Sequence, residues 1–176
     1  MQSLVETITK QIIDHSNIAQ DESIVVNFQQ GEDMWIAQNS FIATLKSSGY
    51  KVYSGKDSIV QGKIVFDVTG IDLKTRYDDT FRESFLGTKK IKRTVIAALA
   101  CQMTDMRAQE VIFSKSFSET FSDTVMVDQI NTLELPSAKS THAELPSEDF
   151  FDRILEPFVI IGATGVAIYL FFHVRS

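Results

Sequence analysis

SIVVNFQQGEDMWIAQNSFIATLKSSGYKVY, residues 23–53, is the stretch that decides the fold. Its first six residues form an apolar run that indicates a buried strand. Asp33 then stands where a helix N-cap is expected, apolar residues recur at helical spacing from Met34 to Leu45, and Gly49 marks the helix end. The last four residues begin a second strand. A strand, a helix and a strand in this order predict two parallel strands joined by the helix.

Three longer strands are expected after this unit. Residues 59–74, 93–105 and 110–121 alternate apolar with polar side chains, which is typical of half-buried antiparallel strands. The short segment 105–109 between the last two predicts a hairpin. The N-terminal residues 1–17 carry apolar side chains at helical spacing without the pattern of a signal peptide, and indicate an amphipathic surface helix.

These elements predict an α+β fold. We expect a mixed, mostly antiparallel sheet of about five strands with helices packed on one face, plus one C-terminal transmembrane helix. The α/β domain would occupy residues 1–121. Residues 122–147, which repeat Glu-Leu-Pro-Ser at 134–137 and 144–147, lack periodicity and would form an extended linker. Residues 148–176 would contain a short helix and the anchor.

The predicted anchor is the segment 157–172, which has sixteen residues without a charge. A helix that is apolar on every side is either a buried core helix or a membrane span. At 1.5 Å per residue it covers about 24 Å, short of the ~30 Å hydrocarbon core, and local thinning would absorb the difference. Its terminal position and small residues favour the span, and the core helix is the alternative. The predicted anchor residues are Pro157, Phe158, Ile160, Gly162, Gly165, Tyr169 and Phe172.

The span also bears on self-association and orientation. Ala163 and Ala167 form a small-xxx-small pair that would allow a homodimer through the span. Arg175 in the tail faces an acidic flank, and positive charge prefers the cytoplasm, so the domain would be periplasmic on a bacterial inner membrane. Met1 as the true start favours a cytoplasmic domain instead. Both orientations stay open at this point.

The residues offer little sign of chemistry. No common catalytic or metal-binding motif is present, so we predict no catalytic residue, no metal and no cofactor. A net charge of −6 argues against a nucleic-acid partner. Cys101 lies on the apolar face of a predicted strand and is expected to be an inert core thiol. The acidic pair Asp78 and Asp79 is expected in a solvated loop. A membrane-bound hydrolase or sensor would require a pocket that assembles Asp78, Asp79 or His15 with a nucleophile, and nothing in the spacing predicts one.

The basic run at 89–93 follows a predicted loop, residues 76–88, that carries aromatic side chains. Exposed aromatics beside clustered cations are suited to anionic lipid headgroups or an acidic partner. Lysines that protect a strand edge from aggregation are the alternative. The candidate partner- or lipid-binding residues are Phe81, Phe85, Lys89, Lys90, Lys92 and Arg93.

Two parts of the chain resemble known proteins. IKRTVIAALACQMTDMRAQEVIFSKSFSETFSDTV (91–125) and RILEPFVIIGATGVAIYLFFHVRS (153–176) resemble a group of uncharacterised bacterial envelope proteins with a small α/β domain and a C-terminal span. LKSSGYKVY (45–53) followed by IVQGKIVFDV (59–68) is more distantly similar to the small domains of curli-pore and penicillin-binding-protein activator lipoproteins. The resemblance implies a binding or assembly domain.

The leading hypothesis is therefore a non-enzymatic, membrane-anchored assembly or scaffold component of a bacterial cell envelope. Its α/β domain would bind a protein partner in a membrane complex, and its span would contact the lipid bilayer. The alternative is a cytoplasmic tail-anchored adaptor that recruits soluble proteins to the membrane.

Overall fold

The computed structural model describes residues 1–19, 22–54, 63–84, 87–147 and 150–173, without the side chains of 150–157. They form two compact units, Met1–Glu144 and Leu145–Ser176. The elements in chain order are α1 (Gln2–Ser16), β1 (Ser23–Phe28), α2 (Met34–Ser47), β2 (Lys51–Ser54), β3 (Ile64–Arg82), β4 (Lys89–Asp105), β5 (Glu110–Met126), η2 (Val127–Gln129), α3 (Ile130–Leu133), η3 (Lys139–Thr141) and α4 (Phe150–His173).

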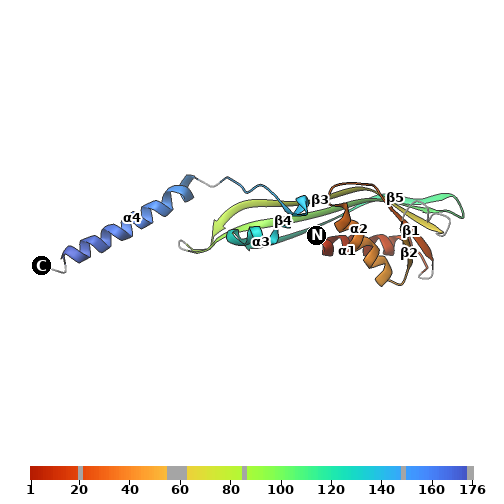
Figure 1. The fold of residues 1–176 in the computed structure, drawn as a ribbon, viewed down its shortest axis with the longest axis horizontal. Coiled ribbons are helices and arrows are strands. Elements are labelled where there is room, and N and C mark those ends of the chain that lie inside the picture. Colours follow the sequence, from red (N-terminus) through yellow and green to blue (C-terminus); the bar gives the residue numbers. More distant parts are fainter. Residues whose placement is uncertain (20–21, 55–62, 85–86, 148–149, 174–176) are drawn as a thin grey trace. The chain divides into compact units, whose positions relative to one another are not determined.

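The first unit is built on a five-stranded sheet in the order β2-β1-β3-β4-β5. β1 runs parallel to β2 and β3, whereas β3, β4 and β5 pair antiparallel. The helices α1 and α2 lie together on one face of the sheet (Figure 1). The predicted mixed sheet, the parallel pair joined by a helix and the hairpin at 105–109 are confirmed.

The helix α2 ends as its sequence predicts but begins differently. Gly49 adopts a left-handed conformation with φ 93°, and the Tyr50 amide donates to the Leu45 carbonyl at 3.2 Å. Asp33 stands at the N-cap position, but its side chain makes no cap hydrogen bond. Its carboxylate instead accepts a hydrogen bond from the Ser140 amide. Asp33 therefore ties the start of α2 to a segment more than one hundred residues later.

The main core lies between the two helices and the sheet. α1 buries Val5, Ile8 and Ile12, which confirms that it is amphipathic. The Phe41 ring from α2 meets the Phe66 ring from β3 edge to face, with 6.1 Å between the ring centroids. Each fully buried side chain of this size stabilises the fold by roughly 1.5–3 kcal/mol. This core therefore holds α1 and α2 to the sheet.

The long strands continue beyond the helices, and residues 127–144 cover them there. β5 extends to Met126 rather than ending at 121, and beyond it Ile130 and Ala138 are buried. Ile130 packs with Tyr77 and Ile91 in a small second core. The extended linker predicted over 122–147 is thus corrected for residues 122–144, which belong to the first unit. Isolated apolar residues without periodicity gave no sign of this packing.

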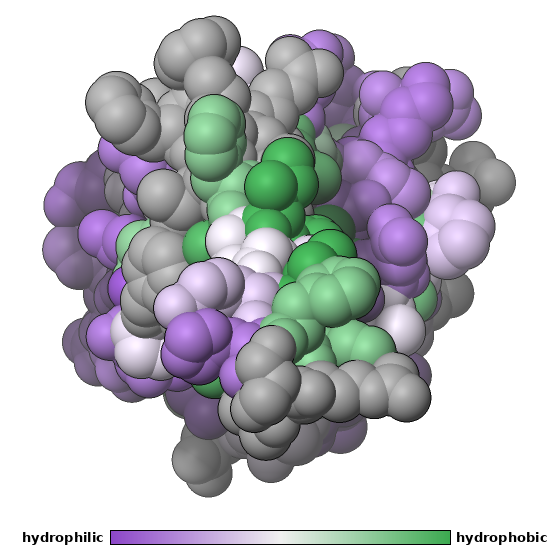
Figure 2. Space-filling view, turned by 90° about the vertical axis from the view of Figure 1, so that its left-hand side faces the viewer, coloured by the Kyte–Doolittle hydropathy of each residue, from purple (hydrophilic) through white to green (hydrophobic). Residues whose placement is uncertain are grey.

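The helix α4 of the second unit has 24 residues and exposes large apolar side chains, including Phe158, Ile160, Tyr169 and Phe172. Figure 2 faces the C-terminal end of α4 and shows hydrophobic side chains gathered at its surface. Among the described residues, no helix combines the length and the apolar character that crossing a bilayer requires. The predicted transmembrane anchor, Pro157 to Phe172 with Gly162 and Gly165, is therefore not supported. Its uncharged stretch covers only about 24 Å.

Candidate partner-binding pocket

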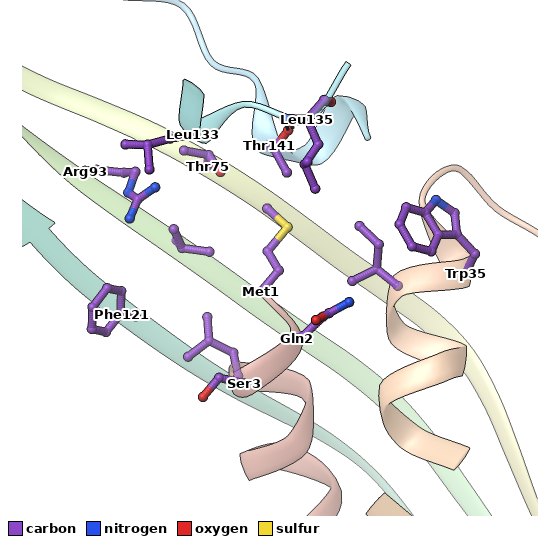
Figure 3. Close-up of a pocket in the computed structure, with 13 residues that line it drawn as sticks. Met1, Gln2, Ser3, Trp35, Thr75, Arg93, Phe121, Leu133, Leu135 and Thr141 are labelled. Carbon is purple, nitrogen blue, oxygen red and sulfur yellow. Dashed lines mark hydrogen bonds between the residues drawn. The ribbon is translucent and has the colours of Figure 1, made fainter. Parts of the chain in front are cut away.

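A pocket lies where the main core ends and the small second core begins. It has a volume of about 510 Å³ and is lined by the first turns of α1 and α2, by β3, β4 and β5, and by residues 133–141 (Figure 3). We call it the junction pocket. Its walls come from six segments, from the first residues of the chain to Thr141, so that only the folded unit assembles it.

The wall formed by residues 138–141 is held by contacts to both helices. The Ser140 amide donates to the Asp33 carboxylate at the start of α2, and the Ser140 hydroxyl lies 3.3 Å from the Met1 sulfur. Ala138 is fully buried beneath this turn. The Thr141 hydroxyl accepts a hydrogen bond of 2.9 Å from the Leu135 amide. These contacts hold the wall in place.

The rim of the junction pocket is apolar and exposed. The exposed fractions are 44% for Trp35, 49% for Phe121 and 51% for Leu135, and Leu133 is also exposed. Figure 3 shows Trp35 on one side of the pocket, Phe121 on the opposite side, and Leu133 and Leu135 above it. Large apolar side chains around a concave surface are characteristic of sites that bind a protein partner, and tryptophan is prominent among binding hot spots.

Arg93 contributes a charged side chain to the lining of the pocket, and its charge is already paired. The Arg93 guanidinium donates to both carboxylate oxygens of Asp123, with 2.9 Å between Nε and Oδ1. This hydrogen bonding raises the pKa of Arg93 above its ordinary value. The Tyr77 hydroxyl donates to Glu134 at 3.2 Å, and burial together with the Glu134 charge raises the pKa of Tyr77 to about 12. Arg93 is therefore not available as an open cation for a phosphate or a lipid headgroup.

The structure places the residues of the basic run on both faces of β4. Phe81 and Lys90 face each other across β3 and β4, and Lys90 makes an ion pair of 2.7 Å with Glu83. Lys92 lies two residues along the same face, whereas Arg93 points to the face of the junction pocket. Lys89 is paired with Arg82 in the strand register. Phe85 lies outside the described residues.

The predicted loop around this run is also corrected. β3 continues to Arg82, so Asp78 and Asp79 belong to a strand, and Arg76 makes an ion pair of 3.2 Å with Asp78. β4 begins at Lys89 and lies between β3 and β5, so its lysines do not decorate an edge strand. In this hairpin the buried face is marked only by Tyr77 and Ile91 among many polar residues, and the sequence therefore gave no strand signal there.

The chemistry-bearing side chains are engaged in structural contacts. Burial raises the pKa of the Cys101 thiol to about 12, so it stays protonated at neutral pH. The His15 ring packs edge-on against Phe113 and contacts Lys115 through Nε2. The strand register places Lys115 eight residues along β5 from Asp123, roughly 27 Å from the Tyr77 end of β3. His15 and Asp78 are therefore not brought together.

The second histidine of this unit, His142, also makes contacts within the fold. His142 contacts Glu134 at 3.1 Å through Nδ1 and the Leu135 carbonyl at 2.9 Å through Nε2. It therefore stabilises the wall of the junction pocket.

Within the part of the chain that the structure describes, no group of three or more His, Cys, Asp or Glu side chains could hold a metal ion.

Comparison with known proteins finds no matching family model and no matching curated protein. Among solved structures, the C-terminal domain of LpoB from Salmonella enterica has 8% identity and a TM-score of 0.41, covering 66% of this chain and 96% of that one. An uncharacterized lipoprotein B from Nitrosomonas europaea has 11% identity and a TM-score of 0.41, covering 62% and 64%. Lipoprotein GNA1162 from Neisseria meningitidis has 16% identity and a TM-score of 0.34, covering 83% and 98%. At these values the likeness assigns no partner and no activity.

Proposed function

We propose that this protein is a non-enzymatic assembly or scaffold domain of a bacterial cell envelope, and that it holds an apolar segment of a protein partner in the junction pocket. The observation that carries the proposal is the exposed apolar rim of Trp35, Phe121, Leu133 and Leu135 around a cavity of about 510 Å³. The envelope setting rests on the resemblance of the sequence to envelope proteins.

The chemistry of the pocket defines the kind of partner segment. Arg93 lines the pocket and is already paired with Asp123, and the other lining side chains are uncharged. A charged partner side chain buried there would therefore lose its hydration without gaining a new ion pair from a side chain of the pocket. Apolar side chains gain about 25 cal/mol for each Å² that they remove from water. The expected occupant is a segment that places one or two large apolar side chains in the pocket.

The non-enzymatic part of the proposal is supported by the state of the reactive groups. A nucleophilic thiol must ionise near neutral pH, and the raised pKa of Cys101 opposes this. His15 and His142 are each held by contacts within the fold rather than presented at the pocket floor. Binding, not turnover, is the activity that this geometry favours.

Crosslinking from Trp35 would test the pocket. We would replace Trp35 by a photoreactive amino acid in the full chain and express this variant in the protein's own cells. The control carries the same amino acid at Lys46, which is exposed near the far end of α2. We expect one dominant protein adduct from position 35 and none from position 46. Leu135→Asp in the first variant should abolish the adduct. The same adduct from both positions, or one that survives Leu135→Asp, would contradict the proposal.

The compartment is tested separately. A chain carrying Cys101→Ser and Ser118→Cys has one exposed thiol, because Ser118 lies on the surface of β5. A thiol reagent that cannot cross the inner membrane should label it in intact spheroplasts if the domain is periplasmic. Labelling only after lysis would favour the cytoplasmic adaptor, the alternative that the sequence leaves open.

A further inference from the structure

The strand β5 forms one edge of the sheet. It has 17 residues, and among the described residues it pairs only with β4. Its other side therefore presents a row of backbone N–H and C=O groups to solvent. A long edge of this kind is a ready template for a further strand. Strand addition at such an edge is a common mode of protein association.

The regular part of β5 begins at Phe113. A bulge separates it from Val111, since Met103 pairs with Phe113 but Thr104 pairs with Val111. From here on, alternate residues face α1 in the order Phe113, Lys115, Phe117, Glu119 and Phe121, and three of them are aromatic. The intervening positions, which face the other side, hold only Ser114, Ser116, Ser118 and Thr120.

This sequence, FSKSFSETF at residues 113–121, complements itself when read in the opposite direction. We propose that β5 pairs antiparallel with β5 of a second copy, about a two-fold axis that passes through Phe117. In this register Lys115 of each copy faces Glu119 of the other, and Phe113 faces Phe121. The small hydroxyl side chains face one another on the opposite side of the sheet. Directly opposed unlike charges and aromatic pairs are the combinations that stabilise antiparallel strands.

Charge complementarity selects this register over its neighbours. An axis shifted to Lys115 would set Lys115 against its own counterpart, and an axis at Glu119 would set two carboxylates against each other. An axis at Ser118 would set both charged residues against phenylalanines. Like charges directly opposite destabilise a strand pair, and a charge against an aromatic ring gains less than an ion pair. Within 113–121 the Phe117 register alone gives two opposite-charge pairs, which identifies a second copy of this chain as the occupant.

The charged side chains already make contacts within one copy, and the experiment must separate these from the interface. Lys115 contacts the His15 ring, and Glu119 accepts a hydrogen bond from the Gln11 side chain. Both partners lie on exposed positions of α1. Replacing Lys115 or Glu119 alone would remove one of these contacts as well as an interface pair. Only a mixture of two variants restores the interface pairs without restoring the contacts to α1.

Sedimentation of the full chain in a mild detergent, which prevents association through the apolar α4, gives the dimer dissociation constant. We expect Lys115→Glu and Glu119→Lys each to weaken the dimer about tenfold, because both interface pairs become repulsive. An equimolar mixture of the two variants should restore dimerisation, since each chain then meets opposite charges. A wild-type chain that stays monomeric, single variants that dimerise like wild type, or a mixture that fails to dimerise would overturn the proposal.

A second set of variants keeps the test independent of the charged residues. In a Cys101→Ser background, Ser116→Cys in one copy would face Ser118→Cys in the other, at a Cα separation of about 5 Å that suits a disulfide. We expect these two chains to form a disulfide-linked heterodimer under mild oxidation. The matched pair Ser116→Cys with Ser114→Cys lies out of register, and should form far less of it. Equal yields from the two pairs would overturn the register.

Discussion

The same three long strands are stabilised in two different ways along their length. Where α1 and α2 cover the sheet, seventeen of the residues that the structure describes are buried in one continuous core. Toward the other end, where residues 127–144 cover the sheet, the buried cluster consists of Tyr77, Ile91 and Ile130. Polar contacts, including the Arg93–Asp123 ion pair, accompany this small cluster. We call these the helix-covered half and the distal half.

The two halves contribute unequally to stability, and this difference shows where a binding site can form without preventing folding. Burial of apolar surface dominates stability, so the helix-covered half determines whether the unit folds. The distal half adds less, and its polar contacts specify geometry more than they supply free energy. The junction pocket lies between the halves, and a partner that fills it would contact both. Binding would therefore stabilise the weaker half.

The largest effect is expected in the helix-covered half. Phe41 is fully buried and contacts the rings of Phe28 and Phe66 at centroid distances of 5.7 and 6.1 Å. Phe41→Ala should lower the free energy of unfolding by about 3–5 kcal/mol, because it leaves a cavity in the core. Denaturant unfolding followed by circular dichroism measures this. Phe121→Ala, at a half-exposed position, is the control, and a similar loss in both variants would contradict the comparison.

A smaller loss of stability is expected from a substitution in the buried cluster of the distal half. Ile130→Ala should cost about 2 kcal/mol, at the low end for such a truncation, since the site has few buried neighbours that would line the cavity. The loss should also be local, so that limited proteolysis cuts within 127–144 sooner while the helix-covered half remains resistant. Faster cutting throughout the unit would show that the two halves are one cooperative structure.

The smallest effect concerns the hydrogen bond between Tyr77 and Glu134. Tyr77→Phe should cost roughly 1–2 kcal/mol at pH 7. The pKa of Tyr77 is raised to about 12 from an ordinary value of 10, so the folded state favours the neutral phenol. Its contribution is full below pH 10 and is lost as the pH rises through 12. The difference in the free energy of unfolding between wild type and Tyr77→Phe should therefore shrink as the pH rises from 10 to about 12.

The pKa of the Cys101 thiol is raised as well. This thiol is present in both wild type and Tyr77→Phe, so its contribution cancels in the difference between their free energies of unfolding. The measurement is chemical denaturation of both proteins at several pH values from 8 to about 12. A difference that stays constant up to pH 12 would mean that the Tyr77 phenol is not linked to folding.

Local signals in the sequence predicted much of the helix-covered half. The apolar run of β1, the helical spacing of α2 and Gly49 at its end each report on neighbouring residues, and the structure confirms all three. Alternation likewise identified β3, β4 and β5, although the ends of the strands were missed. Around Asp78 and Asp79 the apolar pattern is too sparse to indicate a strand, because the small distal cluster buries only Tyr77 from this part of β3.

The junction pocket could not be predicted for a different reason. Trp35 and Leu135 come from segments separated by one hundred residues, and what joins them is the contact of Ser140 with Asp33. In the sequence, Asp33 reads as a helix cap, because a cap uses the same carboxylate in the same position. The covering segment 127–144 buries single residues such as Ile130 and Ala138, which produce no periodicity.

Hydrogen exchange of backbone amides in the full chain tests the contrast between the two halves most directly. We expect the amides of residues 64–68 in β3 and 97–103 in β4 to exchange only through global unfolding. Those of residues 75–77 and 91–93 should exchange through a smaller opening with a lower free energy. Equal protection along both strands would contradict the account, because the distal half would then share fully in the stability of the main core.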